Sequence, residues 1–304
     1  MLSVLALAGF VATQLAIPAG AATAPLKDAR EIAHFDVTAQ QQPENIALEP
    51  GGAADVTFNR ARQVARVAPD GSVTVLATLP APAAGPASVA GIVRGADGSL
   101  YVNYNAGAHS GIWRIAPDGG TPTQVLALPD VKALNGLAFD RGENALYATD
   151  SGRGTVWKVS LTTRTAALWA QGAAFESVNG TGISANGVKV HNGAVWVSNT
   201  DQGTLLRVAI GAHGAAGAVT TVARGITSID DFAFLGDGDT VLAAQNYVSQ
   251  VSIIRPDGTS HTVLTATDGL SNPTSVAVRG STAYVASGAY FTRVDPNLLV
   301  VKVG

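Results

Sequence analysis

The sequence predicts an all-β fold: a six-bladed β-propeller with four-stranded blades, closed by the N-terminal strand in the last blade. A short strand-like motif recurs six times along the chain. The residues two places before its central apolar position are Glu44, Ala90, Asn135, Asn186, Asp230 and Thr274. The steps between them are 46, 45, 51, 44 and 44 residues, a period typical of propeller blades. The intervals hold further apolar runs, separated by turns that contain Gly, Asn and Asp.

Each repeat contains four strand segments, and the two neighbouring repeats in residues 186–264 supply an example of each segment. An inner strand such as residues 186–190 is followed by a strand with an apolar or aromatic start, such as residues 195–198. The third strand carries an apolar-x-Arg/Lys-apolar pattern, as in residues 205–208, and commonly ends in the turn signal Pro-Asp-Gly. The fourth is an outer strand such as residues 262–264.

The two ends of the chain are expected to share one blade. Residues 300–303 fit the third-strand pattern, and the sequence then stops at Gly304 without an outer strand. A missing outer strand would expose a sheet edge, which favours aggregation. The alternating segment of residues 31–37 is the natural replacement, so residues 31–304 form one domain and residues 25–30 a linker.

Residues 1–24 are interpreted as a secretory signal peptide. Residues 2–17 are largely apolar, and the small residues 19–21 suit a signal peptidase. A membrane anchor is the alternative, but Gln14 and Pro18 interrupt the apolar run that a span requires. We therefore expect a secreted protein, extracellular or periplasmic, with no membrane attachment after cleavage.

Composition excludes several classes of function. The 304 residues carry a formal net charge of −3 and no cluster of Lys and Arg, which argues against nucleic-acid partners. There is no cysteine, so thiolate metal sites and thiol nucleophiles are absent. No nucleotide-binding, serine-hydrolase or zincin motif is present. We expect a monomer that binds a small molecule.

Four of the six repeat positions carry oxygen-bearing side chains suited to a hard cation. Inner strands of a propeller surround the central channel and start on one face, so Glu44, Asn135, Asn186 and Asp230 should converge there. Calcium takes six to eight oxygen ligands, whereas zinc and copper prefer His and Cys. The pattern predicts a divalent cation site, with Ca²⁺ the first choice. Ordinary turn chemistry remains an alternative explanation for Asn-Gly and Asp at these positions.

Turns after the second strands return to the same face and supply further candidates. His109 is the histidine on that face and could act as a general base or bind substrate, although an exposed loop histidine is the alternative. Asp150, Asn199 and Asn246 are candidate substrate-binding groups, but turns favour these residue types in any case.

The chain resembles the senescence-marker/gluconolactonase family of six-bladed propellers over residues 31–304. Four segments carry the resemblance: Pro43-Glu44, residues 134–137 with 146–151 and 156–159, residues 185–187, and Asp230-Asp231. The resemblance implies one divalent cation held by Glu44, Asn135, Asn186 and Asp230. It also implies hydrolysis of a lactone or ester, with the metal polarising the carbonyl and Asp230 activating water. Similarity to paraoxonase-like lactonases adds Asp231 as a substrate-site candidate.

Two hypotheses follow from the sequence. The first is a secreted, metal-dependent hydrolase of lactones or related esters. The second is a non-catalytic propeller that binds a protein or glycan through its loop face and holds a structural cation.

Overall fold

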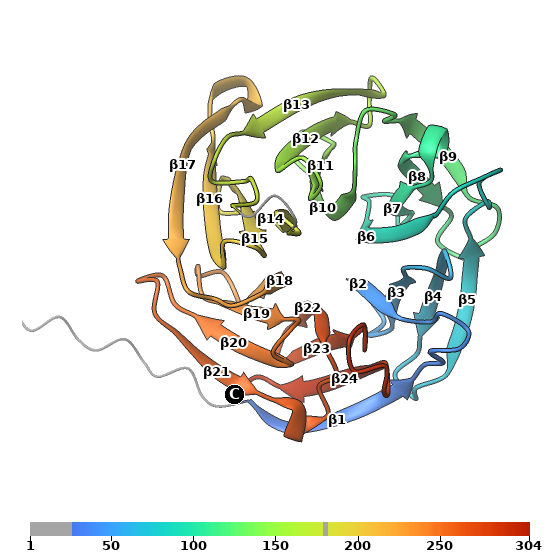
Figure 1. Cartoon of the computed structure of the whole chain (residues 1–304), viewed down its shortest axis with the longest axis vertical. Coiled ribbons are helices and arrows are strands. Elements are labelled where there is room, and N and C mark those ends of the chain that lie inside the picture. The colour runs from blue at the N-terminus through green and yellow to red at the C-terminus, as the bar shows by residue number, and fades with distance from the viewer. Residues whose placement is uncertain (1–25, 179–181) are drawn as a thin grey trace, which may run out of the picture.

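Six four-stranded antiparallel sheets form a ring in the computed structural model, which describes residues 26–178 and 182–304. The inner strands β2, β6, β10, β14, β18 and β22 surround the centre, and each sheet extends outward from there (Figure 1). The predicted six-bladed propeller is therefore confirmed. The predicted signal peptide, residues 1–24, lies outside the described residues. In the described part of the chain, no helix has the length and apolar character that a membrane span requires.

The blades follow one another along the chain. The first three comprise β2 (Pro43–Leu48), β3 (Ala54–Phe58), β4 (Gln63–Val67) and β5 (Val73–Thr78); β6 (Ser88–Arg94), β7 (Leu100–Asn105), β8 (Gly111–Ile115) and β9 (Thr123–Ala127); and β10 (Leu134–Asp140), β11 (Ala145–Asp150), β12 (Thr155–Ser160) and β13 (Thr165–Gln171).

The next two comprise β14 (Ala185–His191), β15 (Ala194–Asn199), β16 (Thr204–Ile210) and β17 (Ala216–Ala223); and β18 (Ile229–Phe234), β19 (Val241–Gln245), β20 (Gln250–Ile254) and β21 (Ser260–Leu264). The last blade joins β22 (Pro273–Arg279), β23 (Thr282–Ser287) and β24 (Asn297–Lys302) to β1 (Lys27–His34). Three short 3₁₀ helices lie in loops: η1 (Gly107–His109), η2 (Ala212–Gly214) and η3 (Ala266–Asp268).

The N-terminal strand β1 closes the last blade, as predicted, by pairing antiparallel with β24. Its bounds differ from the expected residues 31–37. Residues 27–30 belong to the strand and not to a linker, because pairing with β24 continues out to Lys302. The strand ends at His34, where Phe35 turns inward and packs edge-on against Phe58 of the first blade, with ring centroids 4.8 Å apart. The closing strand therefore also contacts the next blade.

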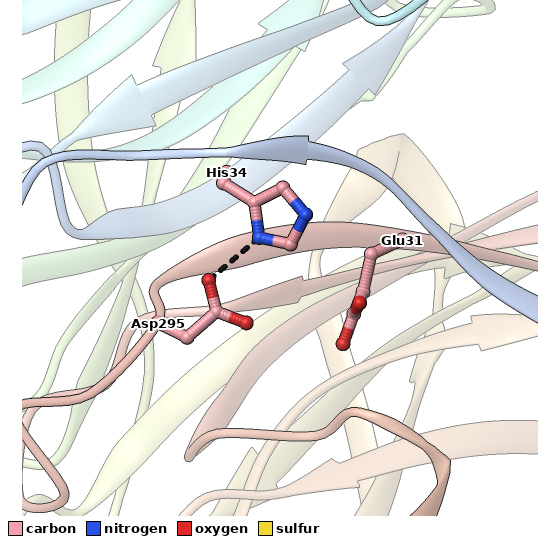
Figure 2. Close-up of side chains that lie close together, drawn as sticks. All are labelled: Glu31, His34 and Asp295. Atoms are coloured by element: carbon pink, nitrogen blue, oxygen red, sulfur yellow. Dashed lines mark hydrogen bonds and ion pairs between the residues drawn. The ribbon is translucent and has the colours of Figure 1, made fainter.

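A surface ion pair adds to this closure (Figure 2). The His34 Nδ1 atom lies 2.6 Å from Asp295 Oδ1, and the carboxylate of Glu31 lies close to both. The hydrogen bond that His34 donates to Asp295, followed by the negative charges of Asp295 and Glu31, raises the pKa of His34 above 6.5, and burial only partly opposes this shift. The side chains of His34 and Asp295 are 61% and 40% exposed, so solvent screens the pair. Its contribution to stability is small and depends on pH.

Apolar side chains fill the wedges between neighbouring blades. One cluster joins Tyr147 and Ala138 of the third blade to Val195 and Val208 of the fourth. Three tryptophans of the second and third strands differ in burial: Trp113 and Trp196 are buried, whereas Trp157 is partly exposed. This packing holds the blades at fixed angles around the centre.

Each inner strand contains a β-bulge near its start, at the recurring position seen in the sequence. In β10, Leu134 pairs with Asp150, and regular pairing resumes only beyond Asn135. It resumes at Leu137, opposite Ala148. The other five inner strands carry a comparable register shift. A bulge bends its strand and redirects its side chains, which explains how these residues can point toward the channel.

Hydrogen bonds from side chains connect each bulge region to the next blade, and we call this set the girdle. In five of the six junctions, the side chain of a residue within a strand donates to a backbone carbonyl of the neighbouring inner strand. The donor and acceptor residues are Thr57 and Ala90, Asn103 and Asn135, Thr149 and Asn186, Ser198 and Asp230, and Thr274 and Pro43. At the remaining junction, Ser275 Oγ donates to Asp231 Oδ2 over 2.8 Å. The girdle runs through the buried interior and fixes where each bulge lies.

Closure of the last blade by β1 predicts that two substitutions in this strand differ in their effect on the free energy of unfolding. Ala33 is 5% exposed and belongs to a core cluster, so Ala33→Glu should bury a carboxylate without a partner. We expect it to lower the free energy of unfolding by about 3 kcal/mol or more. Arg30 is exposed in the same strand, so Arg30→Glu should change it little. Chemical denaturation of both variants measures this, and equal stability would contradict closure by β1.

A second prediction concerns the ion pair between His34 and Asp295. Since folding raises the pKa of His34, its stabilising effect is complete below pH 6.5 and is lost as pH rises through the higher folded pKa. His34→Gln should therefore lower the melting temperature by about 1–2 °C at pH 5 and not at pH 9. Thermal unfolding at both values tests this, and a larger loss at pH 9 would contradict it.

Candidate functional site

A central cavity of about 400 Å³ lies where the inner strands begin. Glu44, Asn135, Asn186 and Asp230 all line it, and each comes from the bulge of a different inner strand. The two other repeat positions differ from one another. Ala90 borders the cavity but has no polar side-chain atom, whereas the Thr274 hydroxyl donates a girdle hydrogen bond to Pro43 O. The structure thus brings together the four side chains that the sequence predicted to converge.

Two amide oxygens in this site have no hydrogen-bond partner within the described residues. They are Oδ1 of Asn135 and Oδ1 of Asn186, and both atoms are buried. Asn186 is oriented by its amide nitrogen, which donates to Thr200 Oγ1 over 3.0 Å and to Asp230 Oδ1 over 2.7 Å. A buried carbonyl oxygen without a partner costs roughly 1–3 kcal/mol. A bound cation would remove that cost at both positions.

The two carboxylates of the site are buried and close enough to influence one another. Burial raises the pKa of Glu44 from 4.5 to about 7, a hydrogen bond from Tyr290 partly opposes this shift, and Asp231 adds to it. Burial raises the pKa of Asp230 well above 3.8, and the charges of Glu44 and Asp231 raise it further. Both shifts show that negative charge at the centre lacks sufficient compensation from the protein.

Glycine follows Asn135 and Asn186 because the neighbouring blade lies very close to the backbone there. A Cβ atom on Gly136 would lie 2.4 Å from Asn186 O, and one on Gly187 would lie 2.5 Å from Asp231 Oδ1. Both glycines lie in bulges within strands. The alternative explanation, that these Asn-Gly pairs are ordinary turns, does not match the structure. The glycines allow the close approach of blades that narrows the ring.

The donor set fits a hard divalent cation. Glu44 and Asp230 supply carboxylate oxygens, and Asn135 and Asn186 supply amide oxygens with no other partner. Calcium favours such all-oxygen sites and completes its coordination with water or ligand. No His is among the described residues that border this cavity, and its oxygen donors do not favour zinc or copper.

His109 is not brought together with these residues, in contrast to the expectation that it is a general base. It ends the helix η1, is exposed, and does not border the cavity. Its backbone carbonyl accepts hydrogen bonds from Trp113 Nε1 and Gln124 Nε2, which come from β8 and β9. These contacts hold the residue toward the outer strands of the blade, away from the channel.

The four candidate substrate residues have different surroundings, and one of them lines the cavity. That residue is Asn246. Asp150 is fully buried and accepts backbone hydrogen bonds from the loop before β10. Asn199 bonds to backbone carbonyls of the loop before β14, and Asp231 forms an ion pair with Lys189. These last three side chains order loops and blades and do not reach the cavity.

Lining residues that the sequence analysis missed include Tyr290, Arg60 and Arg293. Tyr290 is half-buried, and its hydroxyl donates to Glu44 Oε2. Burial, then the charge of Glu44, raises the pKa of Tyr290 well above 10, so the phenol remains a donor at neutral pH. All three residues follow second strands, in the first and last blades. The rule that places these turns on the functional face would have found them.

An exposed aromatic pair forms one side of the cavity mouth. Tyr247 is 54% exposed and Phe291 is 62% exposed, and their rings meet edge to face at 4.9 Å. Both residues line the cavity together with Ile183. An apolar rim of this kind can bind the apolar part of a ligand.

Comparisons with known proteins support the fold and leave the activity open. A family profile described as "Repeat of unknown function (DUF6923)" matches residues 51–230. A search of curated proteins found no match. Among solved structures, a candidate gluconolactonase has a TM-score of 0.68 at 15% identity, over 91% of this chain and 92% of its own.

Two other solved structures are similar over most of their length. A luciferin-regenerating enzyme has a TM-score of 0.67 at 13% identity, over 90% of this chain and 95% of its own. A virginiamycin B lyase from Staphylococcus aureus has a TM-score of 0.61 at 13% identity, over 91% of this chain and 99% of its own. At these identities the likeness establishes the fold alone.

The raised pKa of Glu44 predicts how the metal-free protein responds to pH. Folding raises this pKa from 4.5 to about 7, so stability falls as pH rises through that window and stays lower above it. Glu44→Gln removes the buried charge. In EDTA, it should stabilise the protein at pH 8 by an amount on the order of 2–3 kcal/mol and have little effect at pH 5.

Thermal and chemical unfolding at the two pH values measure this difference. Glu176→Gln serves as the control, because Glu176 is exposed outside the cavity and its substitution should have no comparable pH-dependent effect. Destabilisation of the metal-free protein by Glu44→Gln at pH 8 would contradict the assignment of an uncompensated buried charge.

Proposed function

The chain belongs to the family of repeats of unknown function designated DUF6923, and we propose that it is a divalent-cation-dependent hydrolase of lactones or related esters. The observation that carries this proposal is that two buried amide oxygens, Asn135 Oδ1 and Asn186 Oδ1, have no hydrogen-bond partner among the described residues. They belong to the same cavity as the carboxylates of Glu44 and Asp230. Calcium is the first choice of cation, since every donor is a hard oxygen.

When bound, the cation would polarise the carbonyl of a lactone or ester and stabilise negative charge on its oxygen. Asp230 is the candidate general base, because it lines the cavity and burial raises its pKa toward values useful for proton transfer. Asn186 Nδ2 holds the Asp230 carboxylate by the bond to Oδ1, which leaves Oδ2 the freer oxygen for a water proton.

Other residues of the cavity would bind and orient the substrate. Tyr290 fixes the Glu44 carboxylate by donating to Oε2, so Glu44 retains one orientation. Tyr247 and Phe291 offer an apolar surface at the mouth for the part of the substrate that does not react. The gluconolactonase and luciferin-regenerating enzyme among the similar structures are consistent with a small-molecule substrate. We further propose that the protein is exported by residues 1–24 and acts as a monomer.

The exposed aromatic rim also favours a second candidate function. Tyr247 and Phe291 suit a glycan or a protein side chain as well as a small substrate. In that case the protein is a non-catalytic binding propeller, and the cation only neutralises the buried carboxylates.

One double variant tests the cation site and the hydrolase together. Glu44→Gln with Asp230→Asn keeps side-chain shape and removes both charges. We expect calcium binding to weaken by more than about 100-fold, since affinity depends strongly on the number of charged ligands. Activity on a lactone panel should be lost, while circular dichroism remains that of a folded propeller. Calorimetric titration and hydrolysis assays measure the two effects.

His109→Ala is the matched control, because His109 lies outside the cavity on the same face. It should alter neither calcium binding nor hydrolysis. If the calcium-loaded wild type hydrolyses no lactone or ester in a broad panel but binds glycans, the hydrolase proposal fails and the second candidate stands.

A further inference from the structure

A groove of about 830 Å³ leads outward from the central cavity on the same face. It is lined by the loops that join β3 to β4, β5 to β6, β7 to β8, and β9 to β10. Asn59, Arg60, Ser88, Asn105 and Ala133 border both the groove and the cavity. The two spaces are therefore continuous, and an elongated molecule can occupy both.

Three cationic side chains line the groove: Arg60, Arg62 and Lys132. No Asp or Glu is among the described residues that line it. Asp130, in the same loop as Lys132, borders a different pocket. In the described part of the chain, none of the three cations forms an ion pair with a carboxylate. The groove is thus positively charged in a protein whose net charge is −3.

Several basic residues elsewhere are neutralised by the protein itself. Arg66 and Arg94 share the carboxylates of Asp55 and Glu49, in a partly buried network at the far ends of their strands. By contrast, the partners of Arg62 among the described residues are neutral, and one is the backbone carbonyl of Leu79 at 3.2 Å. Positive charge without a counterion in a concave site attracts negatively charged ligands.

We propose that the groove binds an oxyanion group, such as a carboxylate or phosphate, at one end of an elongated small molecule. The other end of the molecule lies in the central cavity. That second part rests on the proposed function and makes the substrate an anionic lactone or ester. Arg60 stands at the junction, where its planar guanidinium can pair with two oxygens of an anion. A long polyanion is disfavoured, because the rest of the protein carries net negative charge.

The binding half is tested without catalysis by calorimetric titration of suberate and of its uncharged diamide. The proposal expects suberate to bind at least about tenfold more tightly than the diamide, and more weakly as salt increases. Arg62→Gln combined with Lys132→Gln should raise the dissociation constant for suberate at least about tenfold. Lys132→Glu, a single change at an exposed residue, gives a second variant in case the Arg62 substitution affects folding.

Arg224→Gln is the control, because Arg224 is an exposed cation outside the groove whose guanidinium donates a hydrogen bond to the Thr221 hydroxyl. It should leave suberate affinity unchanged. Equal affinity for suberate and the diamide would overturn the proposal. So would suberate binding that survives both groove variants, or that weakens equally in the Arg224 control. Tighter binding of a polyuronate than of suberate would assign the groove to an acidic glycan and also overturn it.

The substrate half is tested by comparing kcat/KM for lactones that differ only by a terminal carboxylate or its methyl ester. The wild type should prefer the carboxylate, and Lys132→Glu should reverse that preference. Suberate binding should persist in Glu44→Gln. If no lactone is hydrolysed but suberate still binds the groove, the hydrolase fails and the anion site remains. If lactones are hydrolysed without preference for the carboxylate, the proposal of an anionic substrate is wrong and the proposal of a hydrolase stands.

Discussion

The hydrogen-bond girdle around the channel is the constraint on which the functional site depends. Each inner strand bulges at the same place, and a side chain from one blade binds the next blade there. These donors and acceptors are buried, so a break would leave a polar group without a partner at roughly 1–3 kcal/mol. The girdle therefore fixes the bulges relative to one another. Without that rigidity, four side chains from four blades could not hold a common geometry.

The centre of the ring concentrates negative charge that the protein does not neutralise. Glu44 and Asp230 are both buried, and their pKa values rise because burial and the charges of neighbouring carboxylates disfavour ionisation. The nearby Asp231 differs, since Lys189 and Ser275 bind its two oxygens. Buried charges without partners are rare in folded proteins because of their desolvation cost. The proposed divalent cation would resolve this imbalance, at the place where two amide oxygens also have no partner among the described residues.

The face around the cavity is chemically asymmetric. Tyr247 and Phe291 lie at the mouth on the side of the last two blades, whereas Arg60, Arg62 and Lys132 line the groove across the first three. A ligand that spans the mouth would meet the aromatic pair on one side and the cationic groove on the other. Loops that follow β3, β9, β19 and β23 supply these groups, and none of them belongs to the girdle. Specificity and framework can therefore change independently.

The sequence by itself determined the six repeats, the closure of the ring and the four residues of the cavity centre. These follow from a local period of about 45 residues, because each blade repeats the same strand pattern and places the same position beside the channel. Many second strands carry a polar residue near their end, such as Thr149 or Ser198, and this recurrence was a visible signal of the girdle. The partner of each such residue lies in the following blade, so the period alone could not assign it.

Only the tertiary structure decided which loop residues reach the site. Asp150, Asn199 and His109 lie at the ends of second strands or in the turns that follow them, as several lining residues do. Their contacts nevertheless hold them away from the cavity. The meeting of Tyr290 with Glu44 joins residues 246 positions apart, and it arises because the last blade packs against the first. The groove likewise depends on four loops whose conformations are set by packing across blades. Local sequence fixes the strands, whereas the direction of a loop side chain depends on neighbours that are distant along the chain.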